Sequence, residues 1–155
     1  MKITSKSLTD TEAAAAYFLK SLTPQKTATI VALHGDLGAG KTAFSKITAR
    51  LLGIPLEVTS PTFVIEKVYE ITKPEARPFV RFIHIDAYRL KGTDELKHLG
   101  WEELIIDSGN LIIIEWPEHV VEAIPENAHR IRITIPSTQL GTSGEGESRI
   151  IEYGS

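Results

Sequence analysis

A glycine-rich segment directly after an apolar run constrains this chain more than any other feature. Residues 35–42 read GDLGAGKT and match the pattern G-x-x-x-x-G-K-[ST] at every position. Glycine lets backbone amides approach a phosphate without obstruction by a Cβ atom, and the helix that starts here adds its positive N-terminal end. In this pattern the lysine reaches the β- and γ-phosphates and the threonine hydroxyl ligates Mg²⁺. The loop residues predicted to contact a nucleotide are Gly38, Ala39, Gly40, Lys41 and Thr42.

The segments on either side of this loop predict a buried strand and a helix. Residues 28–34 are almost all apolar, which is typical of a central strand covered on both faces. Residues 41–52 carry apolar side chains at helical spacing, and Gly53 and Pro55 follow them. The loop therefore lies in a strand–loop–helix unit, the context that the phosphate-binding pattern requires.

Strands and helices are expected to alternate along the rest of the chain. Strands are predicted over residues 2–5, 63–71, 81–86, 111–115, 129–135 and 149–153, with a Gly/Ser-rich turn over 138–147. Helices are predicted over 10–22, with Thr9 and Glu12 as a capping box, over 93–99 with Thr93 as cap, and from Pro117. This order predicts a three-layer α/β fold like that of P-loop NTPases. We expect a mostly parallel central sheet with antiparallel terminal strands, in one domain over residues 1–155.

Two carboxylates end predicted strands and are candidate groups for metal binding and catalysis. Asp86 ends RFIHID and Glu115 ends LIIIE. The carboxyl ends of parallel strands open onto the edge where the phosphate loop lies. A triphosphate-hydrolysing site needs an acidic residue there to hold the metal or to orient water. The residues alone do not decide which of the two carboxylates does which.

Other groups near these strand ends have both a functional and a structural interpretation. The hydroxyls of Ser60 and Thr62 flank a proline, as in a loop that senses the γ-phosphate or in a simple capped turn. Trp116 follows Glu115 and is either a core anchor, a stacking platform or a partner contact. Tyr88 either contacts phosphate or a partner, or packs. His84 alternates with apolar neighbours and is interpreted as a histidine packed within a strand.

A dinucleotide-binding pattern also fits part of the loop. Gly38, Gly40 and Ala43 satisfy G-x-G-x-x-G/A, and Glu57 lies 19 residues after Gly38. This alternative leaves Gly35 and Lys41 without a role, whereas the phosphate-loop pattern uses every unusual residue.

Composition narrows the classes of function. The chain has 155 residues and no cysteine, and the lack of cysteine excludes thiolate chemistry. Its net charge of −3 argues against a nucleic-acid-binding surface of its own. Residues 1–20 lack an apolar stretch behind a basic start, and no apolar run approaches the length of a membrane span. We expect a cytoplasmic protein whose contact with nucleic acid is indirect.

Five motifs together resemble the bacterial TsaE (YjeE) family, the ATPase of tRNA threonylcarbamoyladenosine biosynthesis. They are GDLGAGKT at 35–42, SPTF at 60–63, HIDAYRL at 84–90, ELKHLGWEEL at 95–104 and EWP at 115–117. Only the first is common to phosphate-loop proteins in general. The resemblance implies an ATP- and Mg²⁺-binding protein that acts with the TsaD and TsaB proteins, without a membrane and with tRNA contacted only indirectly. Its implied role is threonylcarbamoyl transfer to the adenosine beside the anticodon of tRNAs that read ANN codons.

The resemblance also implies a role for individual residues. Lys41 would hold phosphate, Thr42 and Glu115 would ligate Mg²⁺, and Asp86 would assist the metal or the attacking water. Ser60 and Thr62 would belong to a nucleotide-sensing loop, Trp116 would support the ATPase, and Thr11 would lie near the adenine.

Three other functions are compatible with a phosphate loop. A small-molecule kinase would need an acceptor site and an arginine-rich lid, whereas Arg130, Arg132 and Arg149 fall in strand-like segments. A regulatory GTPase usually carries N-K-x-D, but Asn110 and Asn127 are followed by Leu and Ala. A nucleotide-gated scaffold, in which hydrolysis is incidental, is the third.

Overall fold

The computed structural model describes residues 1–55, 65–136 and 148–154. One seven-stranded sheet runs through the molecule in the order β1-β7-β6-β2-β5-β4-β3. The strands are β1 (Lys2–Ser5), β2 (Thr29–His34), β3 (Glu66–Glu70), β4 (Arg81–Asp86), β5 (Asn110–Glu115), β6 (His129–Thr134) and β7 (Arg149–Gly154). The helices are α1 (Leu8–Ser21), α2 (Lys41–Leu51), α3 (Thr93–Lys97) and α4 (Trp101–Ile106), with two 3₁₀ segments, η1 (Pro74–Ala76) and η2 (Pro117–Ala123).

The centre of the sheet is parallel and its outer strands are antiparallel. Strand β2 pairs in parallel with β5 and β6, and β4 pairs in parallel with β5. Strands β1 and β7 pair antiparallel at one side, and β3 pairs antiparallel with β4 at the other. The predicted three-layer α/β fold with a mostly parallel centre is therefore confirmed.

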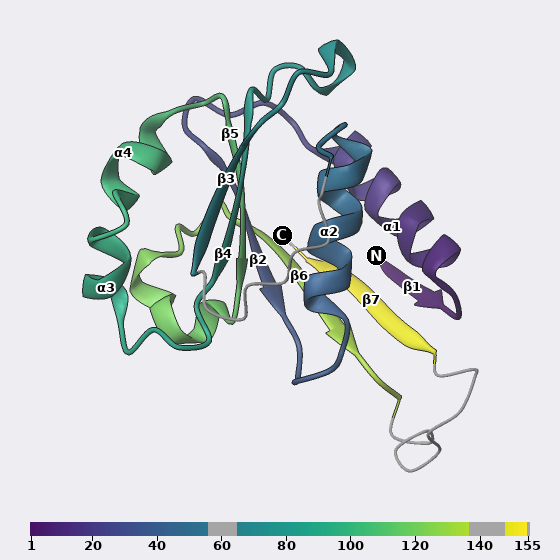
Figure 1. Cartoon of the computed structure of the whole chain (residues 1–155). Helices are drawn as coiled ribbons and strands as arrows, with labels where there is room; N and C mark the ends of the chain where they lie inside the picture. The colour runs from purple at the N-terminus through teal and green to yellow at the C-terminus, as the bar shows by residue number, and fades with distance from the viewer. Residues whose placement is uncertain (56–64, 137–147, 155) are drawn as a thin grey trace.

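Helices cover the two faces of this sheet (Figure 1). On one face α1 and α2 pack against β2, and Phe18, Phe44 and Leu33 lie in that core. On the other face α3, α4 and η2 pack against β5, and Leu96, Trp101 and Ile114 lie in the second core. All six residues of β5 are buried, because helices cover both faces of this central strand. The polar end of β5, Glu115, is thus buried with the rest of the strand.

The helix starts differ from the sequence predictions. Helix α1 begins at Leu8, and the hydroxyl of Ser7, not that of Thr9, accepts the hydrogen bond from the Asp10 amide that caps it. The N-cap residue of α3 is Gly92, which has no side chain to donate or accept a hydrogen bond. Thr93, predicted to be the cap, is the first residue of the helix. The sequence prediction also extended α3 to residue 99 and missed α4, which starts at Trp101 after the left-handed Gly100.

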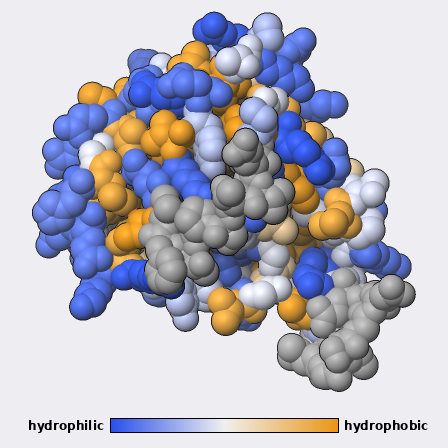
Figure 2. Space-filling view, in the orientation of Figure 1, coloured by the Kyte–Doolittle hydropathy of each residue, from blue (hydrophilic) through white to orange (hydrophobic). Residues whose placement is uncertain are grey.

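The surface carries polar and apolar residues side by side. In the face shown in Figure 2, apolar residues lie in separate groups between hydrophilic ones. Large exposed apolar side chains of the described residues include Leu8, Leu37 and Tyr88. Within the described ranges no helix combines the length and the apolar character that crossing a membrane requires.

The cap of α1 can be tested by substitution. Ser7→Ala removes the acceptor for the Asp10 amide and should lower the free energy of unfolding by about 1 kcal/mol. Thr9→Ala is the matched control and should change it by less than about 0.5 kcal/mol, as is usual for a surface site. Urea unfolding measures both. Equal losses in the two variants would contradict the assignment of the cap to Ser7.

Candidate nucleotide site

The first residue of the loop between β2 and α2, Gly35, has no room for a side chain. A Cβ atom on Gly35 would lie 2.4 Å from the carbonyl oxygen of Ile133 in β6. The loop therefore packs directly against the neighbouring strand. Gly40, the residue before α2, has φ +106°, a backbone angle that residues other than glycine rarely adopt. These two glycines fix how the loop enters the helix.

Lys41 is buried and is held by its own loop. Its Nζ donates to the carbonyl oxygens of Gly35 (2.6 Å) and Asp36 (2.9 Å). It also lies 3.9 Å from the centroid of the Trp116 ring, a cation–π geometry. Burial lowers the pKa of Lys41 below its ordinary value, and the carboxylate of Glu115 opposes this most strongly.

Glu115 joins the end of β5 to the start of α2 and to β4. Its side chain is 2% exposed. Oε2 accepts from the Thr42 hydroxyl (2.9 Å), and Oε1 accepts from the Ser45 hydroxyl (3.0 Å). His84 Nε2 lies 2.7 Å from Oε1. Burial of a carboxylate is costly unless it is hydrogen-bonded, and three groups here meet that requirement.

These neighbours control the ionisation of Glu115. Burial raises the pKa of its carboxyl group. The hydrogen bond and the charge of His84, with the hydrogen bonds of Thr42 and Ser45, lower it, and the net result is a pKa below the ordinary value of 4.5. Glu115 is therefore ionised at neutral pH.

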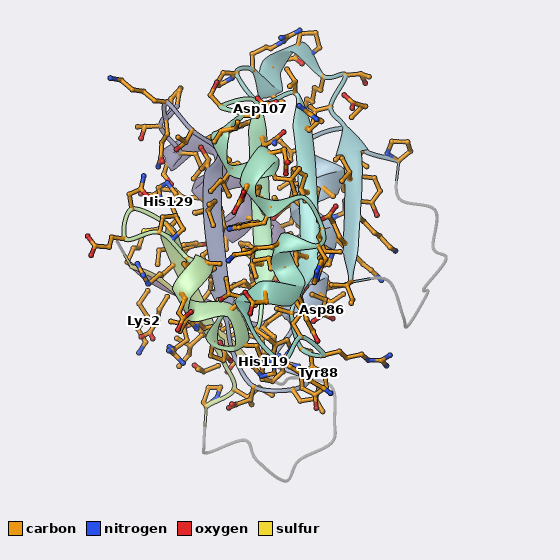
Figure 3. All side chains as sticks on the ribbon, turned by 90° about the vertical axis from the view of Figure 1, so that its left-hand side faces the viewer. Lys2, Asp86, Tyr88, Asp107, His119 and His129 are labelled. Atoms are coloured by element: carbon orange, nitrogen blue, oxygen red, sulfur yellow. The ribbon has the colours of Figure 1, made fainter. Side chains whose placement is uncertain are left out.

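Asp86 lies beside Glu115 at the same edge of the sheet. The two residues are Cα partners in the parallel pairing of β4 with β5. Asp86 is partly exposed, and its Oδ1 accepts from the amide of Tyr88 (3.1 Å). Asp86, Tyr88 and His119 lie near one end of the molecule and Asp107 near the other (Figure 3). The predicted meeting of the two carboxylates at one edge is what the geometry shows.

Aromatic side chains border Lys41 and Asp86. Trp116 has φ +58°, the one described non-glycine residue with positive φ, and it turns the chain from β5 into η2. Its ring lies 4.9 Å from that of Tyr88 and 6.0 Å from that of His119, measured between centroids. Of the three alternatives that the sequence left open for Trp116, the geometry shows a ring that faces the loop lysine.

Thr11 lies on the far side of the loop, beside a cavity of about 370 Å³. The cavity is lined by residues of the α1 start, the loop, α2, β6 and β7, including Ser7, Thr11, Ala39, Gly40, Ile133 and Ile151. The Thr11 hydroxyl is 2.8 Å from that of Ser5, which fixes its position. Loop residues Ala39 and Gly40 thus border this cavity. Lys41 and Thr42 follow them directly, as the first two residues of α2.

The sequence interpretation missed two groups of this site, and two of its predicted residues are not covered by the structure. His84, interpreted as a packed strand residue, instead contacts Glu115. It precedes Asp86 by two positions on β4 and so shares its face, a signal that period-two alternation already carried. Ser45 had no motif to mark it. Ser60 and Thr62 lie outside the described residues.

The donors at this edge suit a hard cation shared with phosphates. The described residues contain no group of three or more His, Cys, Asp or Glu that could hold a metal by themselves. A hydroxyl and a carboxylate lie together at Thr42 and Glu115. Mg²⁺ is usually bound by one or two carboxylates, with phosphate oxygens and water completing the shell, so these residues fit it.

Comparison with known proteins agrees with this geometry. The fold matches a crystal structure of Bacillus subtilis YdiB with a TM-score of 0.71 and 27% identity, over 99% of this chain and 83% of that one. The chain has a P-loop NTPase-like fold. The profile of the family described as "Threonylcarbamoyl adenosine biosynthesis protein TsaE" matches residues 5–143, and the chain belongs to this TsaE family.

Two relatives carry the same description. A tRNA threonylcarbamoyladenosine biosynthesis protein TsaE from Streptomyces coelicolor is 41% identical over 105 residues, 67% of each chain. The TsaE protein of Borreliella burgdorferi is 38% identical over 98 residues, 63% of this chain and 66% of that one. The predicted family membership is confirmed.

The lowered pKa of Glu115 predicts how stability depends on pH. Because the folded pKa lies below 4.5, ionised Glu115 stabilises the fold above pH 4.5, and this contribution fades as the pH falls further. Glu115→Gln should lower the free energy of unfolding at pH 7 by about 1–3 kcal/mol. The gap to the wild type should narrow below pH 4.5.

Urea unfolding between pH 7 and 3 measures this gap, with the exposed Glu122→Gln as control. A gap for Glu115→Gln that stays constant over this range would contradict the assignment.

Proposed function

We propose that this protein is a Mg²⁺-dependent P-loop ATPase of tRNA threonylcarbamoyladenosine biosynthesis. It binds ATP, hydrolyses it slowly to ADP and phosphate, and acts in the cytoplasm with the TsaD and TsaB proteins. Its task is to support threonylcarbamoyl transfer to the adenosine beside the anticodon of tRNAs that read ANN codons. Family membership supports the pathway, and the relatives carry it in their names.

One observation carries the proposal of nucleotide binding. The hydroxyl of Thr42, in the first turn of α2, lies 2.9 Å from the buried carboxylate of Glu115, directly behind a loop that matches the phosphate-binding pattern. The backbone amides at the start of α2 and the positive end of its dipole suit the phosphates of ATP. Lys41 would exchange its contacts with the Gly35 and Asp36 carbonyls for contacts with the β- and γ-phosphates.

Thr42 and Glu115 would hold Mg²⁺, and Asp86 would assist from the neighbouring strand. When bound, Mg²⁺ neutralises charge that develops on the phosphates. Asp86 lies beside Glu115 and is partly exposed, so it is suited to orient the attacking water, while the buried Glu115 would be a ligand of the cation. Trp116 would hold the Lys41 ammonium in place through its ring.

The cavity beside Thr11 supports an adenine site. It adjoins the loop residues Ala39 and Gly40 and has a volume of about 370 Å³, within the range of small-molecule pockets. The roles of Ser60 and Thr62 as nucleotide sensors stay predictions from the sequence. Contact with tRNA through TsaD and TsaB agrees with a net charge of −3, which leaves little basic surface for direct binding.

Two substitutions separate phosphate binding from metal binding. Lys41→Ala should abolish ATP binding, because it removes the cation of the loop. Glu115→Ala should keep part of the nucleotide affinity and lose Mg²⁺-dependent hydrolysis. Isothermal titration and phosphate release measure the two properties. Lys46→Ala, on the exposed side of the same helix, is the control.

Normal hydrolysis by Glu115→Ala together with TsaD and TsaB would contradict the metal assignment. Tight ATP binding by Lys41→Ala would contradict the proposed phosphate site.

Reconstitution tests the biological role. With TsaD, TsaB, tRNA and the threonylcarbamoyl donor present, this protein and ATP together should allow tRNA modification to proceed beyond a single cycle, and omission of either should stop it there. Modification that continues equally without the protein would contradict the role. Phosphate that appears on a metabolite rather than in solution would indicate a small-molecule kinase instead.

A further inference from the structure

The two oxygens of the Glu115 carboxylate have different surroundings. Oε1 is approached by two groups, the Ser45 hydroxyl from α2 at 3.0 Å and His84 Nε2 from β4 at 2.7 Å. Oε2 is approached by the Thr42 hydroxyl at 2.9 Å. Groups from two separate elements thus meet one oxygen, while the other faces the residue that belongs to the phosphate-binding pattern. The Ser45 hydroxyl has one hydrogen, which the Lys41 carbonyl oxygen at 3.1 Å can also accept.

The ring of His84 must donate in this contact. Both carboxylate oxygens of Glu115 accept hydrogen bonds from hydroxyl groups, those of Thr42 and Ser45, and Oε1 is likewise an acceptor toward Nε2 at 2.7 Å. Nε2 therefore carries a hydrogen. The ring is 18% exposed, and His84 lies on the same face of β4 as Phe82, which packs in the core with Phe44 of α2.

We propose that His84 is a positioning residue, which together with Ser45 holds Oε1 of Glu115 so that Oε2 is directed toward Thr42 and the Mg²⁺ of a bound nucleotide. This inference rests on the proposed function, because it assigns His84 to the same metal site. His84 acts only through Glu115 and needs no contact with nucleotide or cation.

The physical reason is the freedom of a glutamate side chain. A carboxylate at the end of a flexible side chain rotates unless other groups hold it, and a metal site needs its ligands fixed within about 0.5 Å. Partners behind a ligand orient it, and their loss typically lowers metal affinity by about 10- to 100-fold. Since Ser45 supplies a second donor to the same oxygen, loss of His84 should weaken the orientation without releasing Glu115 completely.

The test separates metal affinity from nucleotide affinity. Mn²⁺ serves as the probe, and electron paramagnetic resonance measures its affinity for the protein–ADP complex. His84→Phe should lower that affinity by about 10- to 100-fold and leave ADP binding in EDTA unchanged. His84→Gln keeps an N–H donor in place of Nε2 and should recover most of the loss.

Two further variants distinguish a specific loss of metal affinity from a general effect of misfolding. Ser45→Ala removes the other donor with little change of volume, and should also lower Mn²⁺ affinity selectively. His129→Phe is the matched control, because His129 is likewise a strand histidine and its Nε2 has no hydrogen-bond partner among the described residues. It should leave Mn²⁺ affinity unchanged. Long-range ¹H–¹⁵N spectra of the ligand-free wild type should show the hydrogen on Nε2 of His84.

Failure of this inference is distinguishable from failure of the proposed function. If wild-type protein binds Mn²⁺ with ADP and His84→Phe binds it equally well, the positioning role is overturned and the proposed function stands. An equal loss in His84→Gln and His84→Phe would also overturn the role, because the donor would then be irrelevant. If the wild type binds ADP with no dependence on Mn²⁺, the proposed function fails and the positioning role falls with it.

Discussion

The hydrogen-bonded carboxylate of Glu115 is the interaction on which the rest of the site depends. An ionised group 2% exposed to solvent would be strongly unfavourable in the interior without partners. Its partners come from the first turn and a half of α2 and from β4, so the charge ties a helix start to two central strands. The same contacts that make the burial tolerable also define the edge at which a phosphate-bound cation would lie.

Strands on both sides of β2 bring residues to this edge of the sheet. Parallel pairing of β4 with β5 sets Asp86 beside Glu115, and parallel pairing of β6 with β2 brings the Ile133 carbonyl against Gly35. The antiparallel strands β1 and β7 extend the sheet and contribute to the cavity near Thr11. The parallel centre thus carries the glycine-rich loop and the two carboxylates, and the outer strands β1 and β7 help to line the cavity.

The sequence predicted the elements that local patterns specify. The apolar runs marked β2 and β5, and the glycine-rich loop marked the start of α2. Polar strand ends predicted that Asp86 and Glu115 would meet. The cap at Ser7, the break between α3 and α4, and the partners His84 and Ser45 were not predicted. Helix caps depend on the geometry of one turn. Alternation along β4 places His84 on the face of Asp86, but a histidine between apolar residues also suits a packed core, and its contact with Glu115 is set only once β4 and β5 pair. Ser45 becomes recognisable only once α2 packs beside these strands.

A crystal structure of this protein with Mg²⁺ and a non-hydrolysable ATP analogue tests the central claim most directly. The account predicts phosphates on the amides of residues 35–42, with Thr42 and Glu115 on the cation and the adenine in the cavity beside Thr11. Phosphates bound elsewhere, or a cation at the loop without Glu115, would contradict it.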